Sequence, residues 1–158
     1  MNTVVVDAGV LVCGFMADEP YMDEARLLAN AFGQGRVMLI APSLLPHEFT
    51  NSILKAVRRD RLSLCEALDI MGQFDGLSLL LYPVDVLHAF GLAQQYGRTA
   101  YDAAYLALAE QEGVPLITAD ERLYNAVRKA LPWVVWLPEW RSRISLGQPE
   151  EPQETEDE

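Results

Sequence analysis

The sequence predicts an α/β fold, in which helices cover both faces of a parallel sheet of about five strands. Two observations predict it. Short apolar runs rich in β-branched residues alternate with longer segments whose apolar residues recur every three or four positions. The first of these runs is apolar throughout, as expected of a strand that is buried on both faces. Right-handed crossovers between such strands give a three-layer α/β/α sandwich.

The N-terminal part of the chain contains one predicted strand and one predicted helix. Residues 3–6 are apolar or β-branched, and this strand ends at Asp7. Residues 23–32 carry apolar side chains at helical spacing, and Gly33 follows at a position where helices commonly end. No helix is predicted between these two elements.

The next predicted elements are a second strand and the helix after it. The apolar run 37–41 is stopped by Pro42. Ser43 then fits the N-cap of a helix that runs to about Arg59. Pro46 lies in the first turn of this helix, where a missing N–H group is tolerated.

The middle of the chain contains a second helix start with a specific signature. Ser63 and Glu66 have the spacing of a capping box, which opens a helix to about residue 74. The apolar run 77–82 is the third predicted strand, and residues 84–96 form a further helix.

The C-terminal part repeats the same alternation. Thr99 and Asp102 again fit a capping box, and the Ala- and Leu-rich helix that they open stops at Gly113. The remaining predicted elements are a strand at 114–118, a helix at 121–131 and a strand at 133–137.

Length and composition indicate one globular domain. The chain has 158 residues, of which 51% are hydrophobic and 22% charged, and a domain of this length can bury its own core. We expect the folded domain to span residues 1–144 and the acidic segment 145–158 to be disordered, because it lacks apolar anchors. The sequence shows no signal peptide or membrane span, so a cytoplasmic protein without a membrane partner is expected.

The formal net charge of −11 argues at first against a nucleic-acid partner. Six of the acidic groups lie in the last nine residues, and without them less than half of the net charge remains. Several of the other acids belong to the predicted site described next. The net charge therefore weakens a nucleic-acid hypothesis without excluding it.

Four acids fall near positions where a parallel sheet binds ligands. Asp7 directly follows the first strand, and Asp120 follows the fourth. Glu48 lies in the first turns of the helix after the second strand, and Asp102 opens the helix before the fourth strand. Ligands of such sheets bind beyond the carboxyl ends of the strands, so these acids are candidates for one site.

A cluster of carboxylates favours a hard divalent cation. Carboxylates that lie within a few ångströms of one another repel, and a cation with a preference for oxygen ligands relieves that repulsion. Mg²⁺ or Mn²⁺ fits this description and can activate water for hydrolysis of a phosphodiester. The residues therefore indicate metal-assisted phosphodiester hydrolysis.

Each acid also has an ordinary structural explanation. Asp102 fits the third helical position of the capping box with Thr99. Asp120 would favour the positive end of the next helix, for which Thr118 would be the N-cap. The other two acids would be a turn residue and a helix-surface residue. Spacing alone leaves these alternatives open.

Four stretches in a fixed order resemble the PIN domain, particularly the VapC-type toxins of toxin–antitoxin pairs. They are residues 4–8, 41–48, 99–109 and 116–120, and together they cover positions 3 to about 125. Each stretch alone is weak. The Tyr-Asp-Ala-Ala-Tyr segment that begins at Tyr101, with Thr-Ala-Asp one helix and strand later, is specific.

The resemblance implies a sheet of order 3-2-1-4-5 and an endoribonuclease that depends on Mg²⁺ or Mn²⁺. Asp7, Glu48, Asp102 and Asp120 would be its metal-binding and catalytic acids. Water would attack an RNA phosphodiester and leave a 5′-phosphate and a 3′-hydroxyl. The resemblance also implies a homodimer, and a small antitoxin whose segment covers or enters the pocket.

Three departures from the family pattern support an alternative, a weakly active or inactive PIN-like module that binds protein or RNA. Gly9 stands where the family usually has Ser, Thr or Asn beside the metal ligands, and such losses weaken metal binding about 10- to 100-fold. Cys13 replaces a common basic residue, and the acidic segment 145–158 is unusual. A phosphatase or receiver domain is less favoured, because strand 77–82 ends in Pro83 without an acid.

Other polar residues are candidates for supporting roles. Asn51, one helical turn from Glu48, and Thr118 could orient the metal ligands. Arg98 lies just ahead of Asp102 and is a candidate for contact with an RNA phosphate. The densest basic stretch would either contact RNA phosphates or form a solvated helix end, and the second interpretation is favoured. It consists of Lys55, Arg58, Arg59 and Arg61.

Overall fold

The structure is a computed structural model that describes residues 2–146. Its strands are β1 (Asn2–Val6), β2 (Val37–Pro42), β3 (Leu80–Tyr82), β4 (Leu116–Thr118) and β5 (Val134–Trp136). Its α-helices are α1 (Ala8–Phe15), α2 (Met22–Gly33), α3 (Leu45–Arg58), α4 (Leu64–Asp75), α5 (Val86–Tyr96), α6 (Ala100–Glu112), α7 (Glu121–Val127) and α8 (Trp140–Arg143). A 3₁₀ helix, η1 (Leu137–Glu139), precedes α8.

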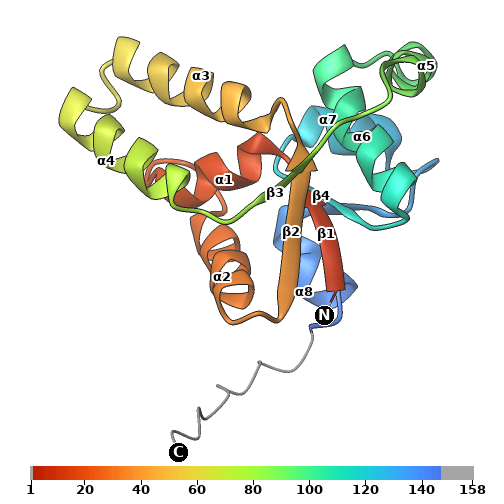
Figure 1. The fold of residues 1–158 in the computed structure, drawn as a ribbon, viewed down its shortest axis with the longest axis horizontal. Coiled ribbons are helices and arrows are strands. Elements are labelled where there is room, and N and C mark those ends of the chain that lie inside the picture. Colours follow the sequence, from red (N-terminus) through yellow and green to blue (C-terminus); the bar gives the residue numbers. More distant parts are fainter. Residues whose placement is uncertain (1, 147–158) are drawn as a thin grey trace, which may run out of the picture.

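The strands form one parallel sheet in the order β3-β2-β1-β4-β5, which confirms the predicted order. All strands therefore end at the same edge of the sheet. In Figure 1 this edge points upward, with the pair α3 and α4 on one side of it and α5 and α6 on the other. The first residues of β1 lie at the opposite edge.

Two hydrophobic cores, one on each face of the sheet, confirm the three-layer sandwich. Along β1, Val5 packs into one core, whereas Val4 and Val6 pack into the other. The first core is covered by helices α3 to α7, and the second by α2 and α8. The three valines are fully buried, as expected of a central strand without polar side chains.

Helix α1 is the main element that the sequence did not predict. Its eight residues include two glycines and two β-branched valines, which have low helix propensity. Two interactions compensate. Asp7 caps the helix by accepting a hydrogen bond from the Val10 N–H group at 2.9 Å, and α1 buries side chains in both cores.

The start of α3 differs from its prediction. Ser43 is not the N-cap, because its N–H group donates to the Tyr82 carbonyl at 2.9 Å and extends the pairing of β2 with β3. The helix begins two residues later, after Leu44, whose side chain makes no capping hydrogen bond. By contrast, the capping box of Ser63 and Glu66 is confirmed, with both of its hydrogen bonds present.

Other boundaries differ by a few residues. Strands β3, β4 and β5 are each three residues long and shorter than predicted, and α7 ends at Val127 rather than at 131. The sequence did not predict η1 and α8. Trp140 of α8 is fully buried, and its indole N–H donates to the Glu24 carbonyl at 3.2 Å, so this segment closes the second core.

The predicted boundary at residue 145 stays a prediction. Asn2 donates a hydrogen bond to the Ser145 carbonyl, and Leu146 packs against the second core. Residues 147–158, which make up most of the acidic segment, lie outside the described residues. Within the described range, no helix is long and apolar enough to cross a membrane.

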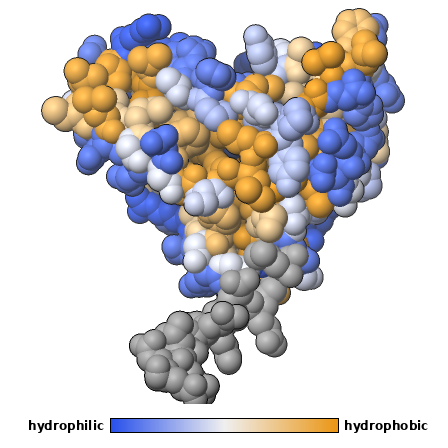
Figure 2. All heavy atoms as spheres, in the orientation of Figure 1, coloured by the Kyte–Doolittle hydropathy of each residue, from blue (hydrophilic) through white to orange (hydrophobic). Residues whose placement is uncertain are grey.

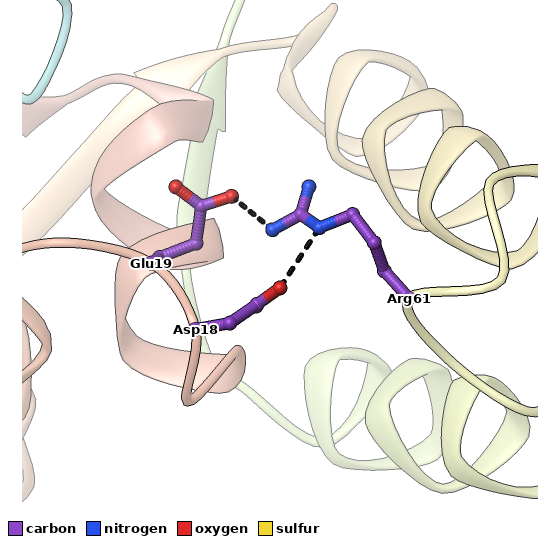
Figure 3. Close-up of polar contacts among 3 residues, drawn as sticks. All are labelled: Asp18, Glu19 and Arg61. Carbon is purple, nitrogen blue, oxygen red and sulfur yellow. Dashed lines mark hydrogen bonds and ion pairs between the residues drawn. The ribbon is translucent and has the colours of Figure 1, made fainter.

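Arg61 joins two loops on the outside of the first core. Its guanidinium contacts Asp18 through Nε at 2.9 Å and Glu19 through Nη2 at 2.7 Å (Figure 3). These contacts link the loop after α1 to the loop between α3 and α4. All three side chains are partly exposed, so each pair contributes little stability.

Two serines provide a matched test of the assigned helix starts. Ser63 is the N-cap of α4, whereas Ser43 precedes α3 without capping it. Ser63→Ala removes a helix cap and should lower the free energy of unfolding by about 1 kcal/mol. Ser43→Ala removes a side chain that caps nothing and should change it by less than about 0.5 kcal/mol. Urea unfolding followed by circular dichroism measures both. An equal loss in the two variants would contradict the assigned helix starts.

Candidate active site

A pocket of about 250 Å³ lies beyond the carboxyl ends of β1 and β4, between α3 and α6. In Figure 1 these helices stand on opposite sides of the strand ends. The four acids singled out from the sequence all line this pocket: Asp7, Glu48, Asp102 and Asp120. The structure therefore brings together every member of the predicted quartet.

Asp7 is the most buried of the four, with 6% of its surface exposed. Its Oδ1 accepts the hydrogen bond from Val10 that caps α1, and its Oδ2 accepts one from the hydroxyl of Thr118. Thr118 is itself fully buried at the end of β4. The carboxylate is thus fixed by the first turn of one helix and by the neighbouring strand.

The environment of Asp7 disfavours its charged form. Burial raises the pKa of Asp7 from its ordinary 3.8 to about 6, although hydrogen bonds from Thr118 and Val10 oppose that rise. The negative charge of Asp120 raises the pKa further. A buried carboxylate with this pKa is stabilised as an anion when a cation lies beside it.

Asp120 is the N-cap of α7. Its Oδ1 accepts hydrogen bonds from the N–H groups of Arg122 and Leu123 at 2.9 and 3.1 Å. The expectation that Thr118 caps this helix is therefore wrong. Thr118 instead donates to Asp7 and accepts from the Asp120 N–H group at 3.0 Å, so its hydroxyl connects the two acids.

Asp102 lies in the first turn of α6. Its N–H group donates to the Thr99 hydroxyl at 3.1 Å, which is the expected helix cap. Burial and the charge of Asp120 raise the pKa of Asp102, whereas hydrogen bonds from Thr99 and the positive charge of Arg98 lower it. Asp102 thus belongs to the first turn that Thr99 caps and also lines the pocket, so the two explanations are compatible.

Glu48 is held by a residue that sequence reasoning missed. The hydroxyl of Tyr105 donates to Glu48 Oε2 at 2.5 Å, across the pocket from α6 to α3. Burial raises the pKa of Glu48, the bond from Tyr105 lowers it, and the charge of Asp102 raises it. Tyr105 is only 2% exposed, whereas Glu48 is half-buried.

The four acids form a connected electrostatic group. The charge of Asp120 disfavours ionisation of both Asp7 and Asp102, and the charge of Asp102 disfavours ionisation of Glu48. Within residues 2–146, however, no three His, Cys, Asp or Glu side chains form a ready-made metal-binding group. The pocket is thus acidic and spacious rather than a closed cage of ligands.

Asn51 and Arg98, which were predicted to support the site, differ in whether they line the pocket. Asn51 lines it, but no described hydrogen bond joins its side chain to any of the acids. Arg98 does not line the pocket; its Nε donates to the Gly97 carbonyl at 3.0 Å. At Gly9 an added Cβ atom would lie 3.3 Å from Asp7 Oδ1, so this position does adjoin the most buried acid.

Two pocket residues, Tyr105 and Lys55, were not assigned to the site from the sequence, although Tyr105 ends the Tyr-Asp-Ala-Ala-Tyr segment. All seven residues from Ala103 to Ala109 are buried, so helical periodicity does not show which side of α6 faces the acids. Lys55 belongs to the basic stretch, whose four members look alike in the sequence. Only the packing of α3 against the strand ends distinguishes it.

Known proteins resemble this chain in sequence and in fold. Ribonuclease VapC3 of Pyrobaculum aerophilum is 32% identical to this chain over 124 residues, which cover 76% of the chain and 91% of VapC3. The crystal structure of PAE2754 from the same organism matches with a TM-score of 0.65 at 20% identity, covering 90% of this chain and 96% of PAE2754.

A second solved structure has the same fold. VapBC2 from Rickettsia felis, bound to a DNA fragment from its promoter, matches with a TM-score of 0.57 at 12% identity, covering 85% of this chain and 96% of the matched chain. At such identities the two structures support the fold alone. The sequence profile of the PIN domain matches residues 4–129. The chain therefore belongs to the PIN-domain family.

Proposed function

We propose that this PIN-domain protein is a metal-dependent endoribonuclease and the toxin of a toxin–antitoxin pair. The observation that carries the proposal is the pocket at the strand ends, which Asp7, Glu48, Asp102 and Asp120 line together. The name of the relative VapC3, a ribonuclease, supports the same activity. The resemblance to VapC-type toxins supports the biological role.

The donor set fits Mg²⁺ or Mn²⁺. Four carboxylates line the pocket and no described His or Cys does, and these cations prefer oxygen ligands. Mg²⁺ keeps several waters and commonly binds through one or two carboxylates together with substrate phosphates, which suits a spacious pocket. Asp7, Asp102 and Asp120 would hold the cation, which would activate water and neutralise charge on the phosphate.

The protein groups have separate tasks in the proposed hydrolysis. Water adds to phosphorus, the bond to the 3′ oxygen breaks, and the products are a 5′-phosphate and a 3′-hydroxyl. Glu48 is the acid best suited to orient the attacking water and accept its proton. Its Oε2 is held by Tyr105, its Oε1 has no described protein partner, and its pKa is raised by burial. Thr118 keeps Asp7 oriented.

One observation favours the inactive module as a second candidate. Gly9 adjoins Asp7 but has no side chain to hydrogen-bond a metal ligand or its water. The loss of such a supporting group typically weakens metal binding about 10- to 100-fold. An inert pocket would leave the protein to act through partner binding.

The proposed function also requires surfaces that bind RNA and partner proteins. Arg98, whose charge acts on Asp102, is the proposed phosphate contact on the α6 side of the pocket. A second copy and an antitoxin would each bury apolar surface, and Figure 2 shows such surface over α4 and α5. Its most exposed apolar side chains are Leu64, Leu68, Val86, Leu87 and Phe90.

Calorimetric titration with Mn²⁺ separates the nuclease from the inert module. The wild-type protein should bind Mn²⁺ with a measurable heat, because the cation relieves the repulsion among the acids. Asp120→Asn should bind more weakly, whereas Asp85→Asn, which changes the N-cap of α5 outside the pocket, should bind like the wild type. No detectable binding at millimolar Mn²⁺ would favour the inert module.

Asp7→Asn should abolish cleavage without harming the fold. Because the pKa of Asp7 is higher in the folded state than its ordinary 3.8, its contribution to stability is complete below pH 3.8 and is lost as the pH rises through about 6. At pH 8 the charged carboxylate then costs the metal-free fold up to ~3 kcal/mol. The melting temperature of Asp7→Asn in EDTA at pH 8 should be unchanged or higher. Retained RNA cleavage by Asp7→Asn would contradict the assignment of Asp7 as a catalytic acid.

Tyr105→Phe should weaken cleavage about 10- to 100-fold, because Glu48 loses the hydrogen-bond donor that orients it. Tyr101→Phe is the control, since Tyr101 is exposed on the same helix and no described hydrogen bond joins it to an acid. In a Glu48→Gln background, Tyr105→Phe should have a much smaller effect. Equal losses in both backgrounds would show that Tyr105 does not act through Glu48.

A further inference from the structure

The wall of the pocket that α3 provides contains a single cationic side chain. Glu48, Asn51, Ser52 and Lys55 recur at helical spacing and all line the pocket. The other pocket-lining residues are acidic, polar or apolar, so Lys55 is the only cation among the described residues that line it. A lysine in an otherwise acidic pocket calls for an explanation.

Lys55 does not neutralise the acids. No described ion pair includes Lys55, although four carboxylates line the same pocket. Seven residues separate it from Glu48, which corresponds to two helical turns or roughly 10 Å along the axis. Lys55 is an exposed residue that lines the pocket, so its ammonium group remains available to a ligand there.

The other three residues of the basic stretch do not line the pocket. Arg61 is held by Asp18 and Glu19, as Figure 3 shows, so its guanidinium is already paired. Arg58 and Arg59 are exposed at the C-terminal end of α3 and do not line the pocket. The structure thus separates one pocket cation from three other basic residues.

We propose that Lys55 binds an RNA phosphate next to the one that is cleaved. This inference rests on the proposed nuclease function. A polyanion that enters a pocket of four carboxylates is repelled, and a lysine ammonium at the rim lowers that repulsion and fixes the position of the strand. Because the contact is to the backbone, it contributes affinity and register rather than base preference.

With this contact, different parts of the pocket would bind two neighbouring phosphates of the RNA. The acids at the strand ends act on the scissile phosphate, whereas Lys55, two turns further along α3, holds its neighbour. Lys55 is therefore a substrate-binding residue, and its loss should affect KM more than kcat. The salt dependence of RNA binding should report the loss of one phosphate contact.

The test compares Lys55→Gln with Arg58→Gln, which removes the same charge one turn away on the same helix. Binding of a fluorescent poly(U) RNA is measured by anisotropy at several salt concentrations, in the Asp7→Asn background so that the RNA stays intact. Lys55→Gln should weaken binding about tenfold and reduce the slope of log K against log salt by about 0.7. Arg58→Gln should change both much less, and Lys55→Arg should retain binding.

Cleavage by the single variants completes the test. In an otherwise wild-type protein, Lys55→Gln should raise KM about tenfold and leave kcat unchanged. Equal effects of Lys55→Gln and Arg58→Gln would overturn the inference, because they would indicate general electrostatics. Unchanged RNA binding by Lys55→Gln, with a lower melting temperature in EDTA, would also overturn it and assign a structural role.

The outcome for the wild-type protein distinguishes this inference from the proposed function. If the wild type cleaves RNA and Lys55→Gln binds and cleaves equally well, only the inference on Lys55 fails. If the wild type neither binds nor cleaves RNA in the presence of Mn²⁺, the proposed function fails and the inference fails with it.

Discussion

The parallel pairing of β1 with β4 is the constraint on which the pocket depends. Val6 lies opposite Ile117, so the residues that follow these strands emerge side by side. Asp7 and Thr118 are 111 positions apart in the sequence, yet the hydroxyl of Thr118 donates to the Asp7 carboxylate. The same hydroxyl accepts from the Asp120 N–H group, so one threonine fixes the relative position of two acids.

Each acid is also part of the structure that carries it. Asp7 caps α1, Asp120 caps α7 and Asp102 lies in the first turn of α6, where the helix dipole favours a negative charge. These roles fix the acids but do not cancel their mutual repulsion, because burial and neighbouring charges still raise the pKa of Asp7 and Asp102. The fold thus holds together charges that a cation would stabilise.

Much of the fold follows from local patterns in the sequence. Apolar β-branched runs predicted the five strands, and the capping box at Ser63 predicted the start of α4. Helix α1 was missed because its glycines and valines have low helix propensity, and burial in two cores outweighs that propensity. Ser43 was misassigned as a cap because its backbone continues a strand pairing that the local sequence does not reveal.

The site was predictable in its acids and much less so in their neighbours. A carboxylate at the end of a parallel strand has a position that topology alone suggests, which is why Asp7 and Asp120 could be identified. Thr118 was a candidate for orienting an acid, but its contact with Asp7, like that of Tyr105 with Glu48, depends on side chains that meet across separate elements. Such contacts have no signature in a single sequence.

The central claim is that the four acids share one divalent cation site. A crystal of the wild-type protein soaked in MnCl₂ tests it most directly through the anomalous scattering of manganese. We expect an anomalous peak in the pocket within coordination distance of Asp7, Asp102 or Asp120 oxygens. A fully ordered pocket with no peak, or with manganese bound only elsewhere on the protein, would contradict the account.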